Sequence, residues 1–300
     1  MSFSLKVKNE LTELKIKKYC CHSSFLLGLL SDCKIEDEKK AVYTTLSAEN
    51  AELVERLLIN TWKVYPQKIE SSRMGAPLYT LEFDIPERGK ELFSLVDEGT
   101  IDFSNGECAS CEINFMRGVF VSNATISDPM TGYHLEFKFK NAKAARLVFE
   151  RLADMGIEPK IINRKGSVGL YYKNSGMIED LLGTLGAVKT YFDFIDCKSK
   201  REVRNGINRR INCEAQNISK SVDAAQKQIA AISKIESAGK LAMLPDELFD
   251  TAKLRLENHS VSLAELARLH NPPISKSGLT HRLAKIMEYA EEIKSTGGKE

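Results

Sequence analysis

The strongest constraint on the fold is an internal duplication in the first two-thirds of the chain. The segment Cys21-His-Ser-Ser-Phe25-Leu-Leu-Gly28 recurs 90 residues later as Cys111-Glu-Ile-Asn-Phe115-Met-Arg-Gly118. Further matches follow in the same order, with small shifts: Glu55-Arg56-Leu57 with Glu150-Arg151-Leu152, Lys68-Ile69 with Lys160-Ile161, Arg73-Met74-Gly75 with Arg164-Lys165-Gly166, and Tyr79 with Tyr171. Chance does not supply such an ordered set, so we interpret residues 1–197 as two copies of one unit, about 19–103 and 109–197.

Each copy predicts the same order of elements: helix, two strands, helix, two strands, helix. Alternating apolar residues at 42–46 and 133–139 indicate strands, and the segments 50–62 and 141–155 indicate helices with Asn50 and Asn141 as N-caps. Turns at 74–75 and 165–167 precede the closing helices, 88–96 and 176–185. We therefore expect an α+β domain built as a repeated αββαββα unit. Gly28 and Gly118 are expected to let the two opening helices, 22–33 and 112–123, approach closely.

This order, with a glycine in each opening helix, resembles the LAGLIDADG homing-endonuclease fold. In that family each motif helix ends in a carboxylate five residues after the glycine, and the two carboxylates hold divalent metals. The matching positions here are Cys33 and Asn123, with Asp32 one residue early on another helix face and Ser122 at its place in the second copy. A thiol and a neutral amide are poor ligands for a hard cation, so we expect no catalytic residues, no metal and no nuclease activity.

The last third of the chain differs from the duplicated part in charge. Residues 1–197 contain 25 Lys and Arg against 28 Asp and Glu, whereas residues 198–300 contain 18 against 13. The net charges are −3 and +5, which raises the expectation of an anionic partner at the C-terminal end. We expect a basic linker and helix at 198–240, followed by a domain at 241–300. Contacts to phosphates are expected from five basic residues in the linker: Lys200, Arg201, Arg204, Arg209 and Arg210.

Residues 241–300 carry the signals of an all-α helix-turn-helix domain. A helix is expected from Pro245 to about Glu257, and Ser262-Leu-Ala-Glu265 is a capping box that opens a second helix. Asn271-Pro-Pro-Ile274 ends it, and Ser275 or Ser277 begins a third helix whose apolar positions predict a buried stripe: Leu279, Leu283, Ile286 and Ala290. A short turn between two such helices is typical of a DNA-binding helix-turn-helix. The expected contacts within about 261–294 are Ser262, Ser275, Lys276, Ser277, Thr280, His281, Arg282 and Lys285.

These C-terminal motifs together resemble those of the bacterial WhiA family. The resemblance rests on Asn208-Arg-Arg-Ile-Asn-Cys-Glu-Ala-Gln-Asn-Ile218, Ser262-Leu-Ala-Glu-Leu-Ala267, Ile274-Ser-Lys-Ser-Gly-Leu-Thr-His-Arg-Leu283 and the opening Ser2-Phe-Ser-Leu-Lys-Val-Lys-Asn-Glu-Leu11. It implies a regulator that binds double-stranded DNA in the bacterial cytoplasm, associated with the nucleoid. It further implies roles in cell division and chromosome segregation, and in sporulation-stage transcription where the host sporulates. Transcription or division proteins are implied as further partners, and no cofactor is expected.

Two alternatives to a DNA-binding regulator remain open at this point. One is a metal-dependent endonuclease, which needs the missing carboxylates. The other is a protein-interaction scaffold whose helix-turn-helix docks a protein instead of DNA. Binding that weakens steeply with salt distinguishes phosphate contacts from protein docking.

Seven cysteines and the absence of a signal-like start favour a reduced, cytoplasmic chain. Cys108-Ala-Ser-Cys111 is a lone C-x-x-C, and with Cys20 and Cys21 it offers four thiolates for a zinc ion. No second C-x-x-C or His pair stands at finger spacing, so we interpret these cysteines as structural thiols. No apolar run approaches the roughly 18–20 residues that span a bilayer, so no membrane partner is expected.

Overall fold

The computed structural model describes residues 1–36, 39–73, 75–101, 103 and 108–296. The chain divides into two compact units, Met1–Glu202 and Val203–Glu300. One helix, α8 (Val188–Ser237), contains the boundary between them. Each unit has its own hydrophobic core and is described by itself.

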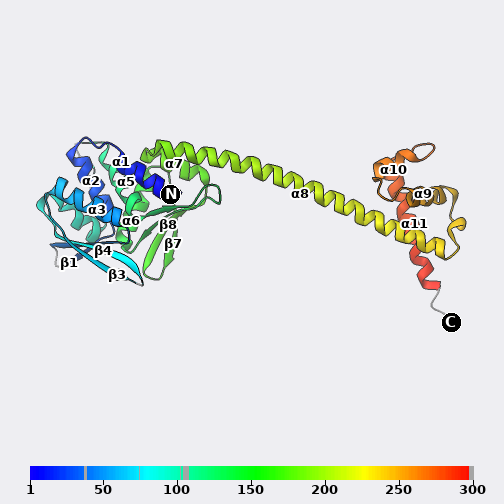
Figure 1. The fold of residues 1–300 in the computed structure, drawn as a ribbon, viewed down its shortest axis with the longest axis horizontal. Coiled ribbons are helices and arrows are strands. Elements are labelled where there is room, and N and C mark those ends of the chain that lie inside the picture. The colour runs from blue at the N-terminus through cyan, green and yellow to red at the C-terminus, as the bar shows by residue number, and fades with distance from the viewer. Residues whose placement is uncertain (37–38, 74, 102, 104–107, 297–300) are drawn as a thin grey trace. The chain divides into compact units, whose positions relative to one another are not determined.

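The first unit contains the expected duplication (Figure 1). After α1 (Phe3–Glu13), the first copy comprises α2 (Tyr19–Leu29), β1 (Lys34–Glu36), β2 (Lys40–Thr45), α3 (Ala48–Leu57), η1 (Leu58–Trp62), β3 (Gln67–Arg73), β4 (Ala76–Asp84), η2 (Glu87–Gly89), α4 (Glu91–Phe93) and η3 (Ser94–Glu98). The second copy comprises α5 (Cys111–Asn123), β5 (Ala124–Ile126), β6 (Leu135–Phe139), α6 (Ala142–Asp154), β7 (Lys160–Arg164), β8 (Ser167–Tyr172) and α7 (Ser175–Leu185). The predicted αββαββα order is confirmed in both copies, with the last helix of the first copy broken into short segments.

The two sheets have the same topology. Each is a four-stranded antiparallel sheet, in the order β1-β2-β4-β3 in the first copy and β5-β6-β8-β7 in the second. In β4, Leu81 and Phe83 are buried and alternate with the less buried Glu82 and exposed Asp84, as expected when helices cover one face of a sheet. The helices of the unit lie over that covered face (Figure 1).

The helices α2 and α5 cross at the two glycines that the sequence singled out. A Cβ on Gly28 would clash with the Phe115 carbonyl oxygen and lie 2.8 Å from the Val119 amide nitrogen. A Cβ on Gly118 would clash with the Phe25 carbonyl oxygen and lie 2.8 Å from the Leu29 amide nitrogen. Both sets of partners differ by 90 residues, so the contact is two-fold symmetric. The predicted close approach through Gly28 and Gly118 is confirmed.

The sequence predicted two N-caps in this unit, one of them correctly. The Asn141 side chain accepts hydrogen bonds from the Lys143 and Ala144 amides, at 2.9 and 3.3 Å, so it is the N-cap that the sequence predicted. The expectation that Asn50 caps the matching helix of the first copy is wrong. Ser47 is the N-cap, and its Oγ accepts from the Asn50 amide at 3.1 Å. Serine competes equally well with asparagine for this position, and Ser47 lies three residues earlier.

The second unit is helical. It contains the C-terminal part of α8, η4 (Leu241–Met243), α9 (Asp246–Glu257), α10 (Leu263–Leu269) and α11 (Lys276–Thr296). The segment 198–240, expected as a basic linker leading into a helix at 224–235, is helical throughout 198–237 as part of α8. No proline occurs between Pro159 and Pro245, so nothing in this basic run stops a helix. Ile232 and Ile235 of α8 are fully buried in the core of the second unit, which therefore begins well before residue 241.

Alanine at Gly28 or Gly118 is expected to destabilise the protein by about 1–3 kcal/mol or more, because each new methyl group meets the backbone of the partner helix and neither helix can retreat without opening the core. Gly206 is the matched control. It lies within α8, where a Cβ meets nothing within 4 Å, so Gly206→Ala should leave stability unchanged or raise it slightly. Thermal unfolding followed by circular dichroism measures the difference. Unchanged melting temperatures for Gly28→Ala and Gly118→Ala would contradict the crossing.

Candidate nucleic-acid interface

The helices α10 and α11 are joined by a short turn that hydrogen bonds hold in place. Ser262 caps α10 by accepting from the Glu265 amide at 3.3 Å, and Ser275 caps α11 by accepting from the Gly278 amide at 3.0 Å. Between them, the Ile274 amide donates to the Ala267 carbonyl oxygen at 3.1 Å, and the Asn271–Pro272 bond is cis. Ser275, and not Ser277, is therefore the N-cap of α11. The hydroxyl oxygens of Ser262, at the start of α10, and Ser275, at the end of the turn, each accept a backbone hydrogen bond.

The predicted buried stripe of α11 is confirmed. Leu279, Leu283, Ile286 and Ala290 are at most 3% exposed and pack into the core of the second unit. Partners in that core come from the other helices of the unit, among them Ala252 of α9 and Leu266 and Ala267 of α10. Burial of this stripe fixes the rotation of α11 about its own axis. The opposite face of the helix must therefore point to solvent.

The exposed face of α11 brings together five of the residues that the sequence proposed for DNA contact: Lys276, Ser277, Thr280, His281 and Lys285. The Thr280 hydroxyl donates to the Lys276 carbonyl oxygen at 2.8 Å, and the Ser277 and Ser275 hydroxyls are 3.0 Å apart. All five lie within the first half of the helix. Cationic and short polar side chains in this arrangement can bind phosphates and reach the edges of bases.

Arg282 lies apart from this exposed group. Its Nη2 is 3.0 Å from the Glu247 carboxylate of α9, and its side chain is only 22% exposed. The ion pair ties α11 to α9, so the structure gives Arg282 a bracing contact within the unit. The Glu247 side chain is 74% exposed, so solvent screens the pair and its contribution to stability is small.

Two buried polar residues, Arg255 and His270, lie in the second unit, and the sequence did not predict their burial. Arg255 is 1% exposed, and its Nη1 donates to the Val261 carbonyl oxygen at 2.8 Å. His270 is 6% exposed, and burial lowers its pKa, as does the nearby Arg282 cation, while Asp250 acts in the opposite direction. Within the described part of the chain, Arg255 Nε and His270 Nε2 have no hydrogen-bond partner. The one sequence feature that indicates burial of Arg255 is its place in the helical repeat of α9, next to the apolar positions Ala252 and Leu256.

The basic run of α8 crosses the boundary between the two units, with Lys200 and Arg201 in the first and Arg204, Arg209 and Arg210 in the second, and is largely exposed. Lys200 pairs with Asp196 at 2.6 Å and Arg210 with Glu214 at 3.0 Å, both one helical turn apart and well exposed. Arg201 lies over the Tyr133 ring, with 4.6 Å from its guanidinium carbon to the ring centroid. Arg204 and Arg209 are exposed on the same helix. Exposed pairs of this kind are weak, so Lys200 and Arg210 can exchange their partners for phosphates at low cost.

The ends of α2 and α5 hold no pair of carboxylates. Cys33 is 4% exposed, and burial raises its pKa. Asn123 donates to the Lys138 carbonyl oxygen at 3.1 Å and accepts from the Ser31 hydroxyl at 3.4 Å. Each of these side chains is engaged within the first unit.

Asp32 is engaged as well. Its Oδ1 accepts from the Lys140 and Asn141 amides, both at 2.8 Å. Burial raises its pKa, whereas the two backbone hydrogen bonds lower it. The carboxylate is therefore part of the turn that leads into α6, on the partner copy, and does not project freely from the end of α2.

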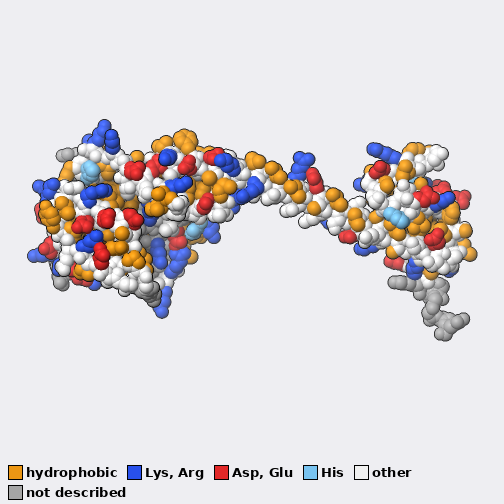
Figure 2. Space-filling model, in the orientation of Figure 1, with side chains coloured by type: hydrophobic (Ala, Val, Ile, Leu, Met, Phe, Trp, Pro, Cys, Tyr) orange, Lys and Arg blue, Asp and Glu red, His pale blue; other side chains and the backbone are white. Residues whose placement is uncertain are grey.

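The open faces of the two sheets differ in charge. Strand register places acidic and basic residues together on the first sheet: Lys34, Glu36, Lys40, Glu82 and Asp84. The second sheet presents Lys138, Lys160 and Arg164 together with Glu136, which pairs with Arg164. The face of the first unit seen in Figure 2 likewise mixes basic and acidic side chains. The charged residues named on these two described sheet faces therefore include both signs, whereas phosphate binding favours a uniformly basic surface.

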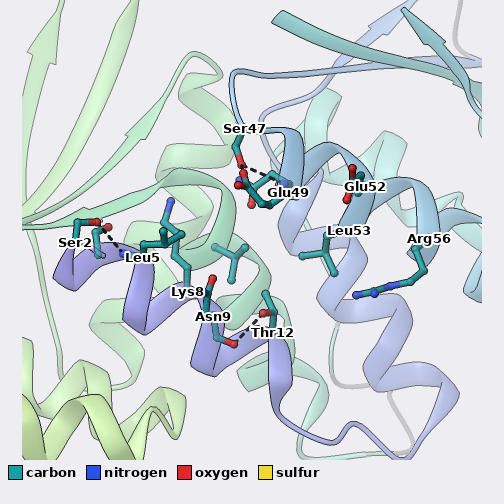
Figure 3. A pocket seen from close by; sticks show the side chains of 13 residues that line it. Ser2, Leu5, Lys8, Asn9, Thr12, Ser47, Glu49, Glu52, Leu53 and Arg56 are labelled. Atoms are coloured by element: carbon teal, nitrogen blue, oxygen red, sulfur yellow. Dashed lines mark hydrogen bonds between the residues drawn. The ribbon is translucent and has the colours of Figure 1, made fainter. Parts of the chain in front are cut away.

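A pocket of the first unit lies between α1 and α3 (Figure 3). Its volume is about 430 Å³, and its charged lining includes Lys8 and Arg56 as well as Glu49 and Glu52. Burial lowers the pKa of Lys8 to about 8, and the Glu49 carboxylate accepts from the Ser47 hydroxyl at 2.8 Å. Charges of both signs line the pocket, so it carries no preference for an anion.

Four cysteines are the described residues that could hold a metal ion. Cys20, Cys21, Cys108 and Cys111 come together in the first unit, where α2 and α5 begin. None of the helices in the described part of the chain has an apolar stretch long enough to cross a bilayer.

Comparison with known proteins identifies both regions. A family model described as the WhiA C-terminal HTH domain matches residues 207–290, and one described as the WhiA LAGLIDADG-like domain matches residues 113–204. The probable cell division protein WhiA of Clostridium novyi (strain NT) is 34% identical, over 99% of this chain and 100% of that protein. The protein of the same name from Ruminiclostridium cellulolyticum is 32% identical, over 98% of each.

Two solved structures share the fold. Full-length WhiA from Thermatoga maritima is 23% identical, with a TM-score of 0.58 over 97% of this chain and 99% of that one. The N-terminal LAGLIDADG domain of WhiA is 20% identical, with a TM-score of 0.50 over 62% of this chain and 92% of that domain. Identity to the Clostridium novyi protein over nearly the whole of both chains places this protein in the WhiA family.

Proposed function

We propose that this protein is a regulator that binds double-stranded DNA through α11. The observation that carries the proposal is the exposed face of α11, where Lys276, Ser277, Thr280, His281 and Lys285 lie opposite a fully buried stripe. The match of residues 207–290 to a helix-turn-helix model supports it. Relatives are named as probable cell division proteins, so we place its role in cell division and chromosome segregation, with control of sporulation-stage genes where the host sporulates.

In this mechanism the first half of α11 enters the major groove. Thr280 and His281 are short enough to meet base edges there, while Lys276 and Lys285 neutralise phosphates on either side. The N-terminus of α11 adds backbone N–H groups that favour a phosphate. The buried stripe of Leu279, Leu283, Ile286 and Ala290 fixes the orientation of α11, and the Arg282–Glu247 pair adds a contact to α9.

The basic residues of α8 are proposed to add sequence-independent affinity. Lys200, Arg201, Arg204, Arg209 and Arg210 follow one another along this helix over about three turns. Each phosphate contact that they make releases counterions and makes binding more sensitive to salt. Because these contacts do not depend on sequence, we propose that the protein is bound to the nucleoid in the cytoplasm. Other transcription or division proteins are proposed as further partners.

We further propose that the protein is not an enzyme. Metal-dependent cleavage needs oxygen ligands that hold divalent cations beside the scissile phosphate. At the ends of α2 and α5 the corresponding groups are a buried thiol, Cys33, and an amide, Asn123, and the Asp32 carboxylate is bonded to the Lys140 and Asn141 amides. The LAGLIDADG-like unit is then a scaffold.

Substitutions on α11 should separate phosphate contacts from base reading. Lys285→Ala is expected to weaken binding to all duplexes about equally, because a phosphate contact carries no sequence information. Thr280→Ala or His281→Ala should cost about 1–3 kcal/mol on a selected target site and much less on random DNA. Fluorescence anisotropy with a selected duplex and a scrambled one, over a series of salt concentrations, measures both effects.

Lys253→Ala is the charge-matched control, since Lys253 is exposed on α9. It should leave both affinities nearly unchanged. If Lys253→Ala reduces binding as much as Lys285→Ala, and Thr280→Ala and His281→Ala do not alter specificity, α11 is not the reading helix. Binding that is insensitive to salt would instead favour the protein-docking alternative.

The purified protein is expected to leave supercoiled plasmid intact with either Mg²⁺ or Mn²⁺, because no carboxylate pair is available to hold the metal. Agarose gels that separate supercoiled, nicked and linear forms measure the outcome. Asp32→Asn serves as the control for a contaminating nuclease. Metal-dependent cleavage by the wild-type protein that disappears in Asp32→Asn would contradict the assignment as a non-enzyme.

A further inference from the structure

Four cysteine side chains from two distant parts of the sequence converge on one point in the first unit. Cys20 and Cys21 lie in the first turn of α2, Cys111 begins α5, and Cys108 lies three residues before it. Their Sγ atoms all lie within 4.8 Å of one another, and Cys21 Sγ is 3.5 Å from Cys108 Sγ. Neither the DNA-binding face of α11 nor the hydrophobic crossing of α2 and α5 requires this arrangement.

The sulfur–sulfur separations fit a single tetrahedral metal ion. A Zn–S bond of about 2.3 Å gives a tetrahedron whose edges are about 3.8 Å long. The Cys21–Cys108 separation of 3.5 Å is close to that edge, and the upper limit of 4.8 Å for all pairs exceeds it by about 1 Å. An iron–sulfur cube places several ions between its thiolates and needs them farther apart.

We propose that Cys20, Cys21, Cys108 and Cys111 form a structural zinc site. Four thiolates that fill all four positions of a tetrahedron are characteristic of structural zinc, whereas a catalytic ion keeps one position open. Cys21 and Cys111 are buried and Cys20 and Cys108 are partly exposed, which gives the ion a route of entry.

Positive charge from two helix ends and two side chains lies near the cluster. The site lies at the N-termini of α2 and α5, where the positive ends of both helix dipoles converge. A zinc ion with four thiolates carries a net charge of −2. Lys18 is close enough to Cys108, and Arg117 close enough to Cys21, for electrostatic attraction, so two cations oppose that charge.

A zinc ion bound here would link the N-terminal ends of α2 and α5. Cys21 precedes Gly28 by seven residues and Cys111 precedes Gly118 by seven, so each thiol lies about 10 Å before the crossing along its helix. Cys21 and Cys111 are equivalent in the duplication, while Cys20 and Cys108 are not. The site therefore belongs to the pair of copies, and neither copy can form it alone.

The test uses the full-length protein, purified anaerobically with a reductant that does not chelate metals. Elemental analysis should find one zinc ion per chain, and the double variant Cys108→Ser/Cys111→Ser should lose it. Cys197→Ser/Cys213→Ser is the matched control, because these cysteines lie outside the cluster and should leave zinc content unchanged. Removal of zinc from the wild-type protein by a chelator should lower its melting temperature by several degrees, restored by added zinc.

Cobalt(II) keeps the proposal testable if the serine variant does not fold. Titration of the metal-free wild-type protein with Co²⁺ should give the intense visible absorption of a tetrahedral thiolate site, saturating at one equivalent. Absence of zinc together with absence of this absorption would overturn the proposal. So would a disulfide within the cluster in the anaerobic preparation, stoichiometric iron and sulfide, or equal zinc loss in Cys197→Ser/Cys213→Ser.

Discussion

The first unit depends on direct contact between the backbones of α2 and α5. At Gly28 and Gly118 the partner helix lies where a Cβ would otherwise stand, and the contacting atoms repeat with the 90-residue period of the duplication. Because the helices are this close, their flanking side chains, such as Phe25 and Phe115, are forced outward into the surrounding core. Each sheet then covers its own side of one helix pair. The symmetry of the whole unit follows from this crossing.

The same crossing determines what meets at the two ends of the helix pair. At the C-terminal ends it brings the Ser31 hydroxyl within hydrogen-bond distance of Asn123. Asn123 and Cys33 are the two positions that the resemblance matched to the carboxylates of the LAGLIDADG motif. The one nearby carboxylate, Asp32, stabilises the turn before α6. The polar groups at these helix ends therefore hydrogen-bond within the first unit. In our proposal, DNA recognition belongs to the second unit, whose hydrophobic core orients α11.

Much of this architecture could be predicted from the sequence, because each weak local pattern occurs in both copies and the second occurrence supports the first. The glycines, the order of strands and helices, and the buried stripe of α11 all follow from repetition or periodicity. The length of α8 did not, since a basic run indicates solvent exposure and leaves open whether the chain is helical. Ser47 was missed as a cap because Asn50 offers a similar side chain three residues later. The clustering of Cys20, Cys21, Cys108 and Cys111 needs the crossing itself, since 87 residues separate Cys21 from Cys108.

In our account the second unit supplies most of the affinity for DNA and the first supplies little. This claim is tested most directly by measuring the affinity of each unit for the same duplex. Residues 203–300 retain Ile232 and Ile235, which complete the core of the helix-turn-helix, so this fragment is the appropriate one. Fluorescence anisotropy at fixed salt should compare it with residues 1–202 and with the full chain. The account predicts that 203–300 retains most of the affinity and sequence preference of the full chain, while 1–202 binds weakly. Tight binding by 1–202, with none by a folded 203–300 fragment, would contradict it.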